Sequence, residues 1–283
     1  METSASHRSQ ALVKAAKRAI ARPWYLTIIA ATVLCAVYLL EVLINWGHVA
    51  ERSLYSNLGI LPVGLAATLV TWSAARRRLD PRARTAWELL SISFGCFFAG
   101  DFLYFYYQNV LGITPFPSLA DAGYLVYYPL MFAGLICLPG RGSERARLGR
   151  LSVNLIVLIA AGAAMVTYVY LVPMLGSPRD DLLAYVLSAG YPMGDLLLLG
   201  GLAALLVRRG EHRIQGSLWV LGAGLMVGLG ADVIFGYQTI HGALQAGGLC
   251  DAAYMLSWIL FAWAGYAEFA RVGRENLQRG VSE

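Results

Sequence analysis

Long apolar runs separated by short polar connections dominate the pattern along the chain. A helix that spans a membrane needs about 20 consecutive, mostly apolar residues. No connection between the runs is long enough to hold a soluble domain. The pattern therefore predicts an all-α, polytopic membrane protein. Eight runs predict one transmembrane helix each: 24–46, 58–75, 86–107, 118–138, 151–172, 181–207, 216–237 and 248–270.

The composition agrees with this pattern and excludes some partners. The chain is 58% hydrophobic and only 14% charged, whereas soluble globular chains are about 25% charged. The net charge of +5 does not indicate nucleic-acid binding, because the arginines lie in short blocks between apolar runs. That placement is typical of membrane topology, so we expect the lipid bilayer as a partner and no nucleic acid.

Lysine and arginine are distributed very unequally over the connections. Of the 22 such residues, 20 fall in the two tails and in the loops after the second, fourth and sixth runs, and only Arg52 and Arg179 lie in the remaining loops. Cytoplasmic loops carry the excess of positive charge. We therefore expect a bacterial inner-membrane protein with both termini in the cytoplasm. Arginine-rich and arginine-poor connections alternate along the chain, and an odd number of spans would not place all the arginine-rich ones on the same side of the membrane.

An internal repeat with an offset of 130 residues organises the chain. Asp121-Ala122-x-Tyr124 matches Asp251-Ala252-x-Tyr254, and Asp101 matches Asp232 with a one-residue slip. Pro62-Val63-Gly64 matches Pro192-Met193-Gly194 at the same offset. The repeat predicts two tandem four-helix units that insert the same way up, related by a pseudo-twofold axis along the membrane normal. The expected units are a basic tail (1–23), the first repeat (24–139), a cytoplasmic loop (140–150), the second repeat (151–270) and a cytoplasmic tail (271–283).

Carboxylates inside the apolar runs are the strongest functional signal, because ionisable groups at membrane depth are costly and usually functional. The expected topology puts the aspartates of both repeats in the outer parts of their helices, with aromatic side chains on the same faces. We expect an outward-facing acidic–aromatic cavity that suits a cation or another small polar ligand from the outer side. The candidate ligand-binding residues are Asp101, Tyr104, Gln108, Asp121, Tyr124, Tyr128, Tyr191, Asp195, Asp232, Gln238, Asp251, Tyr254 and Trp258.

Several of these aspartates also have a purely structural interpretation. Asp121 and Asp251 begin their helices, so helix capping explains them as well as ligand binding does. Asp101 and Asp232 lie deeper, where no cap explains them and a function is favoured. Asp195 has no acidic counterpart in the first repeat, and it is interpreted either as functional or as a satisfied buried acid.

We expect neither a cofactor nor a metal site. His48 and His241 lie on the expected outer side, but no spacing typical of metal ligands accompanies them. Lys14 and Lys17, the lysines of the chain, both precede the first run, so no transmembrane lysine is present for a retinal Schiff base.

Three stretches carry a resemblance to a known family: PSLADAGYLVYYPLMFAGL (117–135), YPMGDLLLL (191–199) and CDAAYMLSW (250–258). The chain resembles the N-terminal multi-helix membrane sensory module of bacterial GGDEF and GGDEF–EAL proteins, which make or degrade cyclic di-GMP. The resemblance covers about residues 50 to 270 and implies a sensory input function. Neither output motif occurs in the sequence, so the resemblance implies no cyclase activity. The output would pass to a cytoplasmic signalling protein or through a homodimer.

Two weaker resemblances suggest enzymes. Gly100-Asp101 and Ala231-Asp232 are similar to the pattern of lysoplasmalogenase-like eight-helix membrane hydrolases, which implies that Asp101 and Asp232 are catalytic, one polarising water and one acting as acid. More loosely, GLGAD (228–232) and MGD (193–195) resemble intramembrane aspartyl proteases, which pair aspartates from adjacent helices. A small-molecule or ion transporter is a further alternative, although the inner halves of the helices carry few polar residues.

Overall fold

The protein is described by a computed structural model of residues 2–44, 49–78, 80–113, 116–138, 182–208, 216–240 and 247–279, with the isolated positions 160, 164, 167 and 172. These residues form helices and no strands. The helices are α1 (Glu2–Leu43), α2 (Val49–Arg76), α3 (Pro81–Phe105), the π-helix η1 (Tyr106–Val110), α4 (Leu119–Cys137), α7 (Leu182–Arg208), α8 (Gly216–Ile240) and α9 (Leu249–Arg279).

The prediction of an all-helical membrane protein is confirmed in its main feature. Five stretches of the described helices are long and apolar enough to cross a membrane: Pro23–Leu43, Leu54–Arg76, Pro81–Val110, Leu119–Cys137 and Gly216–Gln238. The helix expected over 151–172, and the two histidines considered as ligands, His48 and His241, lie outside the described residues. The number of eight spans stays a prediction.

The ends of the helices differ from the predicted ends. α1 begins at Glu2 and α9 continues to Arg279, so much of the two expected tails is helical. In α9 the ion pair between Arg271 and Glu275, one turn apart, supports the extension. α3 begins earlier than expected because Asp80 caps it, accepting bonds from the backbone N–H groups of Arg82 and Ala83, both at 3.3 Å.

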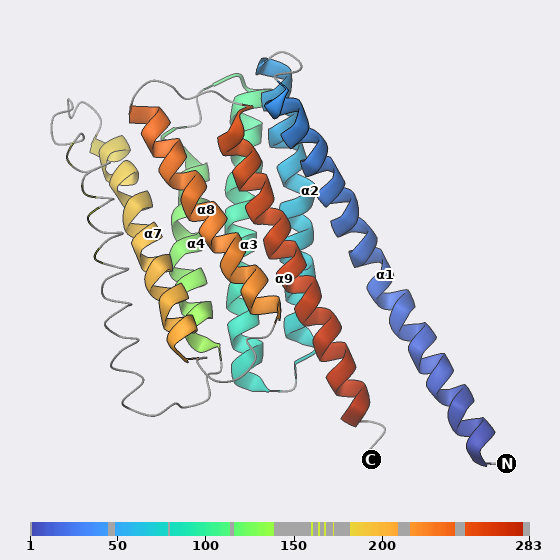
Figure 1. The fold of residues 1–283 in the computed structure, drawn as a ribbon. Coiled ribbons are helices and arrows are strands. Elements are labelled where there is room, and N and C mark those ends of the chain that lie inside the picture. The colour runs from blue at the N-terminus through green and yellow to red at the C-terminus, as the bar shows by residue number, and fades with distance from the viewer. Residues whose placement is uncertain are drawn as a thin grey trace.

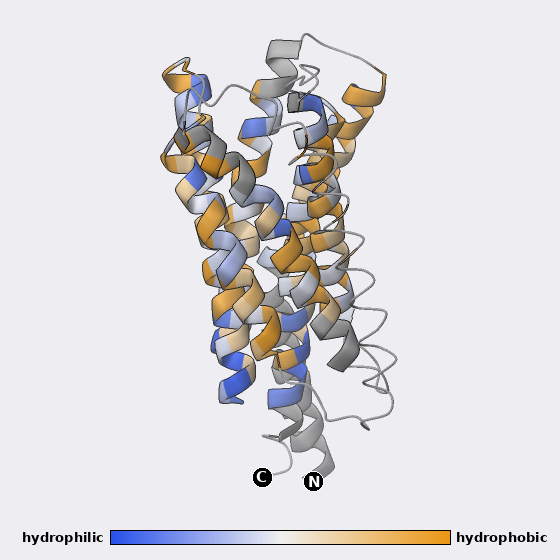
Figure 2. Ribbon diagram, turned by 90° about the vertical axis from the view of Figure 1, so that its left-hand side faces the viewer, coloured by the Kyte–Doolittle hydropathy of each residue, from blue (hydrophilic) through white to orange (hydrophobic). Residues whose placement is uncertain are grey.

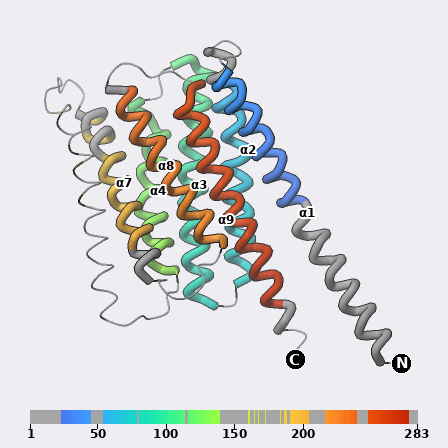
Figure 3. The backbone as a smooth tube through the Cα atoms, viewed as in Figure 1, coloured from blue at the N-terminus to red at the C-terminus, as the bar shows by residue number. Residues whose placement is uncertain are grey.

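Six helices form a ring in the order α2, α3, α4, α7, α8 and α9, which the contact between α9 and α2 closes. α1 packs outside the ring against α2 and α9. α1, α3 and α8 run away from the end of the bundle that holds both chain ends, and α2, α4, α7 and α9 run towards it (Figures 1 and 3). The order α2–α3–α4 followed by α7–α8–α9 is the order expected of a tandem duplication, which itself stays a prediction.

An aromatic cluster fills the ring between α3, α4 and α9. The indole of Trp258, 1% exposed, lies 5.3 Å from the ring centroid of Phe97 and 5.8 Å from that of Phe94. Phe94 stacks on Phe261 at 4.7 Å, and Phe97 lies 4.8 Å from Tyr127. This packing fixes the position of α9 against α3, which matters for the site below.

The end of the bundle with the chain termini, here called the basic end, holds a buried ion cluster. Hydrophilic residues gather at this end (Figure 2). The fully buried carboxylate of Glu268 pairs with Arg78 from the end of α2. It also accepts bonds from Arg271 at 2.8 and 3.1 Å and from the Ser217 hydroxyl at 2.9 Å. Glu268 therefore ties α2, α8 and α9 together.

Candidate functional site

The opposite end of the bundle carries the aspartates predicted from the sequence, because α3 and α8 finish there and α4 and α9 begin there (Figure 1). Aromatic hydrogen-bond donors surround these acids. The acid–tyrosine network is defined here by its members: Asp101, Asp121, Asp195, Asp232, Tyr124, Tyr128, Tyr191, Tyr254 and Trp258.

Asp101 joins three helices. Its Oδ1 accepts a bond from the Tyr124 hydroxyl of α4 at 3.0 Å. Its Oδ2 accepts a bond from the indole Nε1 of Trp258 in α9 at 2.9 Å. The bond to Tyr124 follows from the predicted helix faces. The bond to Trp258 crosses from the first expected repeat to the second, and nothing in the periodicity of either helix indicated it.

Asp232 makes the matching bond in the second half of the chain. Its Oδ1 accepts a bond from the Tyr254 hydroxyl of α9 at 2.7 Å, just as Asp101 accepts one from Tyr124. The offset that aligns Tyr124 with Tyr254 thus also aligns their acceptors to within one residue. Such a matching pair of bonds is what the predicted internal repeat would produce, and the repeat itself stays a prediction.

A second carboxyl group, that of Asp195 in α7, lies near enough to Asp232 to interact with it. Asp195 is 7% exposed, and the Tyr128 hydroxyl lies beside it. The other carboxyl oxygen of Asp195, Oδ1, is buried and accepts no hydrogen bond from the described part of the chain. The hydrolase resemblance pairs Asp232 with Asp101, whereas the structure brings it near Asp195.

Asp121 acts as a cap and as a network member at once. One oxygen, Oδ2, accepts the backbone N–H of Ser118 at 2.7 Å and completes a capping box at the start of α4. The other oxygen, Oδ1, accepts a bond from the Tyr191 hydroxyl of α7. The sequence offered capping and ligand binding as alternative interpretations of Asp121. In the structure one oxygen caps the helix and the other belongs to the network, so the two interpretations do not exclude each other.

Asp251 stands at the matching position in α9. Its Oδ2 accepts the backbone N–H of Gly247 at 2.6 Å, so it also caps its helix. Tyr104 of α3 lies near enough to interact electrostatically with this carboxylate. These two residues form a polar layer between the network and the end of the bundle.

Gln108 and Gln238 lie at the rim of the site. The Gln108 side chain in η1 accepts a bond from Asn57 of α2 at 3.0 Å, and π-helices of this kind are frequent at functional sites. The Gln238 carbonyl oxygen is buried without a hydrogen-bond partner among the described residues. The sequence analysis missed Asn57, because this residue lies just before the predicted run 58–75.

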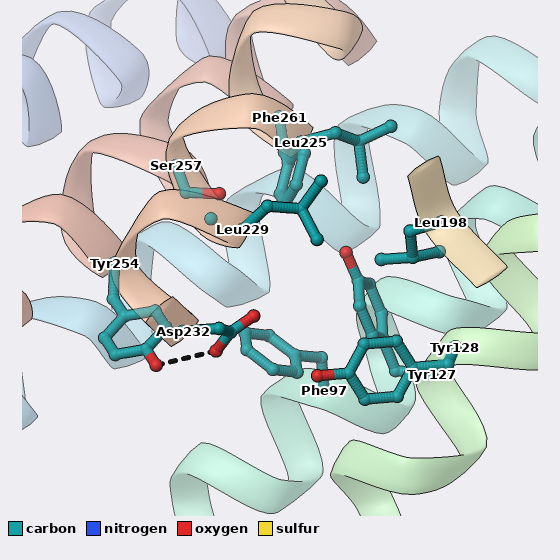
Figure 4. A pocket seen from close by; sticks show the side chains of 11 residues that line it. Phe97, Tyr127, Tyr128, Leu198, Leu225, Leu229, Asp232, Tyr254, Ser257 and Phe261 are labelled. Atoms are coloured by element: carbon teal, nitrogen blue, oxygen red, sulfur yellow. Dashed lines mark hydrogen bonds between the residues drawn. The ribbon is translucent and has the colours of Figure 1, made fainter. Parts of the chain in front are cut away.

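A small cavity lies beside Asp232 in the middle of the network. Five helices line it, and the hydroxyl groups of Tyr127 and Tyr128 point into it from α4 (Figure 4). Its volume of ≈ 20 Å³ has room for about one water molecule. The sequence analysis also missed Tyr127. It predicted that Asp121 and Tyr128 share one face of their helix, and Tyr127 does not lie on that face.

The arrangement of charges suits a cation or a proton and does not suit an anion. No lysine, arginine or histidine is a member of the network. Among the described residues, no three His, Cys, Asp or Glu side chains converge as the ligands of a metal ion would. The donors are phenols and an indole, which hold carboxylates in place without neutralising them.

No protein-family model, curated protein or solved structure matches the chain. The sensory-module and hydrolase resemblances therefore stay predictions.

Removing one phenol from the network tests whether its hydrogen bonds stabilise the bundle. We expect Tyr124→Phe and Tyr254→Phe each to lower the free energy of unfolding by about 2 kcal/mol, because each leaves a carboxyl oxygen in the bundle without its donor. Unfolding in mixed micelles measures this. Tyr55→Phe, whose side chain is exposed, is the control and is expected to cost less than about 0.5 kcal/mol. Equal stability of all three variants would contradict the prediction.

Proposed function

We propose that the chain is a membrane sensory module of the bacterial inner membrane, in which the acid–tyrosine network receives the signal. The observation that carries this proposal is the continuity of α9. Trp258 and Tyr254 of this helix hold Asp101 and Asp232, and the same helix continues to Glu268 and Arg271 at the basic end. It has 31 residues and thus a length of about 46 Å.

A rigid helix that touches the network at one end transmits a change there to its other end. Binding of a small ligand changes either the charge of Asp101 and Asp232 or their hydrogen bonds. Either change alters the bonds that Trp258 and Tyr254 of α9 donate to these aspartates. At the basic end, α9 is held by the Glu268 cluster and by the bond from Asn276 to the Arg77 carbonyl oxygen at 2.8 Å. A shift of α9 would change its contact there with a cytoplasmic signalling protein or with a second copy of the chain.

The abundance of arginine at the basic end supports a cytoplasmic position for it, by the positive-inside rule. The arginines at this end include Arg76, Arg77, Arg78, Arg82, Arg84, Arg271 and Arg274. The network then faces the outer side, where a signal from the environment arrives.

A distance measurement across the basic end tests the sensory role. Spin labels are placed at Thr85→Cys in α3 and Arg274→Cys in α9, two exposed positions, after the four native cysteines are replaced by alanine. We expect Asp101→Asn to change the label-to-label distance by about 2 Å or more, the scale of signalling helix shifts, because an amide replaces the carboxyl group to which Trp258 and Tyr124 donate.

The matched control is Glu41→Gln in α1, an acid outside the network. It undergoes the same carboxylate-to-amide change and is expected to leave the distance unchanged. If Asp101→Asn and Asp232→Asn both leave the distance as it is in the parent protein, α9 does not transmit the state of the network and the sensory role fails.

The proximity of Asp195 and Asp232 favours a membrane hydrolase as the second candidate. Two neighbouring carboxyl groups, one of which lines a cavity with room for a water molecule, are the groups needed for acid–base hydrolysis. A lysolipid in vesicles is the substrate to assay, given the lysoplasmalogenase-like pattern of the sequence. Turnover that disappears in both Asp195→Asn and Asp232→Asn would establish the enzyme, and its absence in the parent protein would dismiss it.

A further inference from the structure

The cavity beside Asp232 brings oxygen-bearing side chains of three helices together. One carries a carboxyl group and four carry hydroxyl groups: Asp232 of α8, Tyr127 and Tyr128 of α4, and Tyr254 and Ser257 of α9. The other side chains that line the cavity are apolar. Hard cations are bound by oxygen ligands of this kind, carboxylate and neutral oxygens together.

The hydroxyl group of Tyr127 is the one that points to a ligand. The Tyr127 side chain is 6% exposed, and its hydroxyl group points into the cavity (Figure 4). No hydrogen bond joins it to another side chain of the lining, whereas Tyr254 donates to Asp232 at 2.7 Å and Ser257 donates to the Gly224 carbonyl oxygen at 2.9 Å. Burying a hydroxyl group without a partner is costly. A ligand in the cavity would supply that partner.

The size and the lining of the cavity limit the ligand to a small monovalent cation. The volume of ≈ 20 Å³ holds about one water molecule, which excludes organic cations and hydrated ions. Ca²⁺ takes about 6–8 oxygen ligands and Mg²⁺ usually keeps several waters, so neither fits the five oxygen-bearing side chains and the volume. The lining includes one acid and no base, and a single positive charge matches it.

We propose that the ligand of the site is a dehydrated sodium ion, held in this cavity by the Asp232 carboxylate and by the hydroxyl oxygens of α4 and α9. The proposal rests on the sensory function proposed above and names the ligand of the same network. Binding exchanges the water shell of the ion for protein oxygens and involves no covalent step. Potassium, the larger ion, is the competitor to test.

The bound ion joins α4, α8 and α9, because its ligands come from all three helices. Without the ion, α9 keeps the bond from Tyr254 to Asp232 but shares no ligand with the hydroxyl groups of α4 in this cavity. The sodium concentration on the outer side thus changes how firmly α9 is held near its start. The length of α9 carries this change to the basic end.

Thermal unfolding of the full chain in micelles, in sodium, potassium or choline chloride of equal ionic strength, tests the proposal. We expect sodium to raise the Tm by about 3 °C over choline, and potassium to raise it less. Asp232→Asn and Tyr127→Phe should each abolish the rise. Glu41→Gln and Tyr55→Phe, which make the same kinds of change outside the cavity, should keep it.

Tyr127→Phe removes an oxygen from the cavity without breaking a hydrogen bond between the lining side chains, so this variant is expected to fold as the parent does. Equilibrium binding of radioactive sodium to the unaltered protein needs no variant, and we expect one ion per chain. A protein that binds no sodium, or that has the same Tm in all three salts, holds water in the cavity and overturns the proposal. A rise that persists in both cavity variants places the ion elsewhere and overturns it too.

The spin-label distance, measured in sodium and in choline, separates this proposal from the sensory role. Sodium that binds while the distance stays constant supports the cation site and contradicts the sensory role. A distance that responds to Asp101→Asn in a protein that binds no sodium supports the sensory role and contradicts the sodium site.

Discussion

Replacing Glu268 with glutamine is expected to lower the free energy of unfolding by about 3 kcal/mol. The Glu268 carboxylate is fully buried, and the Arg78 and Arg271 side chains that it binds are only 13% and 20% exposed. The amide of glutamine keeps a hydrogen-bond acceptor but removes the charge that both guanidinium groups face. Breaking a buried ion pair by removing one partner typically costs 3–5 kcal/mol, because the remaining charge is left uncompensated. Partial exposure of the arginines places the expected value at the lower end.

The measurement is equilibrium unfolding in mixed micelles, with Glu275→Gln as the matched control. Glu275 also pairs with Arg271, but it is 47% exposed, and exposed pairs contribute about 0.5 kcal/mol or less. The double variant Glu268→Gln/Arg271→Gln should recover part of the loss, since it removes one of the two unpaired charges. A Glu268→Gln protein as stable as the parent would show that the cluster does not hold α2, α8 and α9 together.

The second large effect is expected from Gly123→Ala in α4, where α3 and α4 touch through their backbones. A methyl group on Gly123 would lie 2.6 Å from the carbonyl oxygen of Cys96 and 3.0 Å from the backbone nitrogen of Gly100. Backbone atoms cannot rotate away as a side chain can, so the two helices must separate. Overpacking of this kind costs about 1–3 kcal/mol, and we expect a value near 3 kcal/mol.

Separation of α3 and α4 also lengthens the hydrogen bond between Tyr124 and Asp101, the neighbours of these glycines. The Gly123→Ala variant should therefore lose the network as well as stability, and the spin-label distance should change as it does for Asp101→Asn. Gly230→Ala in α8 is the control, because no atom lies within 4 Å of the added methyl group. In a helix interior this exchange is expected to be neutral or to stabilise by about 0.5–1 kcal/mol. Equal stability of the two variants would contradict the close packing of α3 on α4.

The positions of the helices could be predicted because bilayer thickness sets the length of each apolar run. The described helices α4 and α7 begin and end within one or two residues of the predicted runs. The end of α9 could not be predicted in this way. Beyond the membrane its length depends on local pairs such as Arg271 with Glu275, and on the burial of Glu268, an acid inside a run that composition alone assigned to lipid.

The site could be predicted only within neighbouring helices. Asp101 with Tyr124, and Asp232 with Tyr254, follow from spacing on helices that are adjacent in the chain. The bond from Trp258 to Asp101 and the proximity of Asp195 to Asp232 depend on the order of helices around the ring. A single sequence gives the face on which a residue lies, but not the helix that this face meets.

The closure of the ring by α2 and α9 has a consequence for biosynthesis. Trp258 and Asp101 are 157 positions apart, and Asn276 and Arg77 are 199 apart, so these contacts form only after α9 has been made. The chain is synthesised from its N-terminus. Until α9 has been made, α2 and α3 lack their contacts with it, and Asp101 is bound by Tyr124 alone. Docking of α9 then supplies Trp258 to Asp101 and Glu268 to Arg78 in one step. Errors in assembly should concentrate at this last step, with degradation of chains in which α9 has not docked.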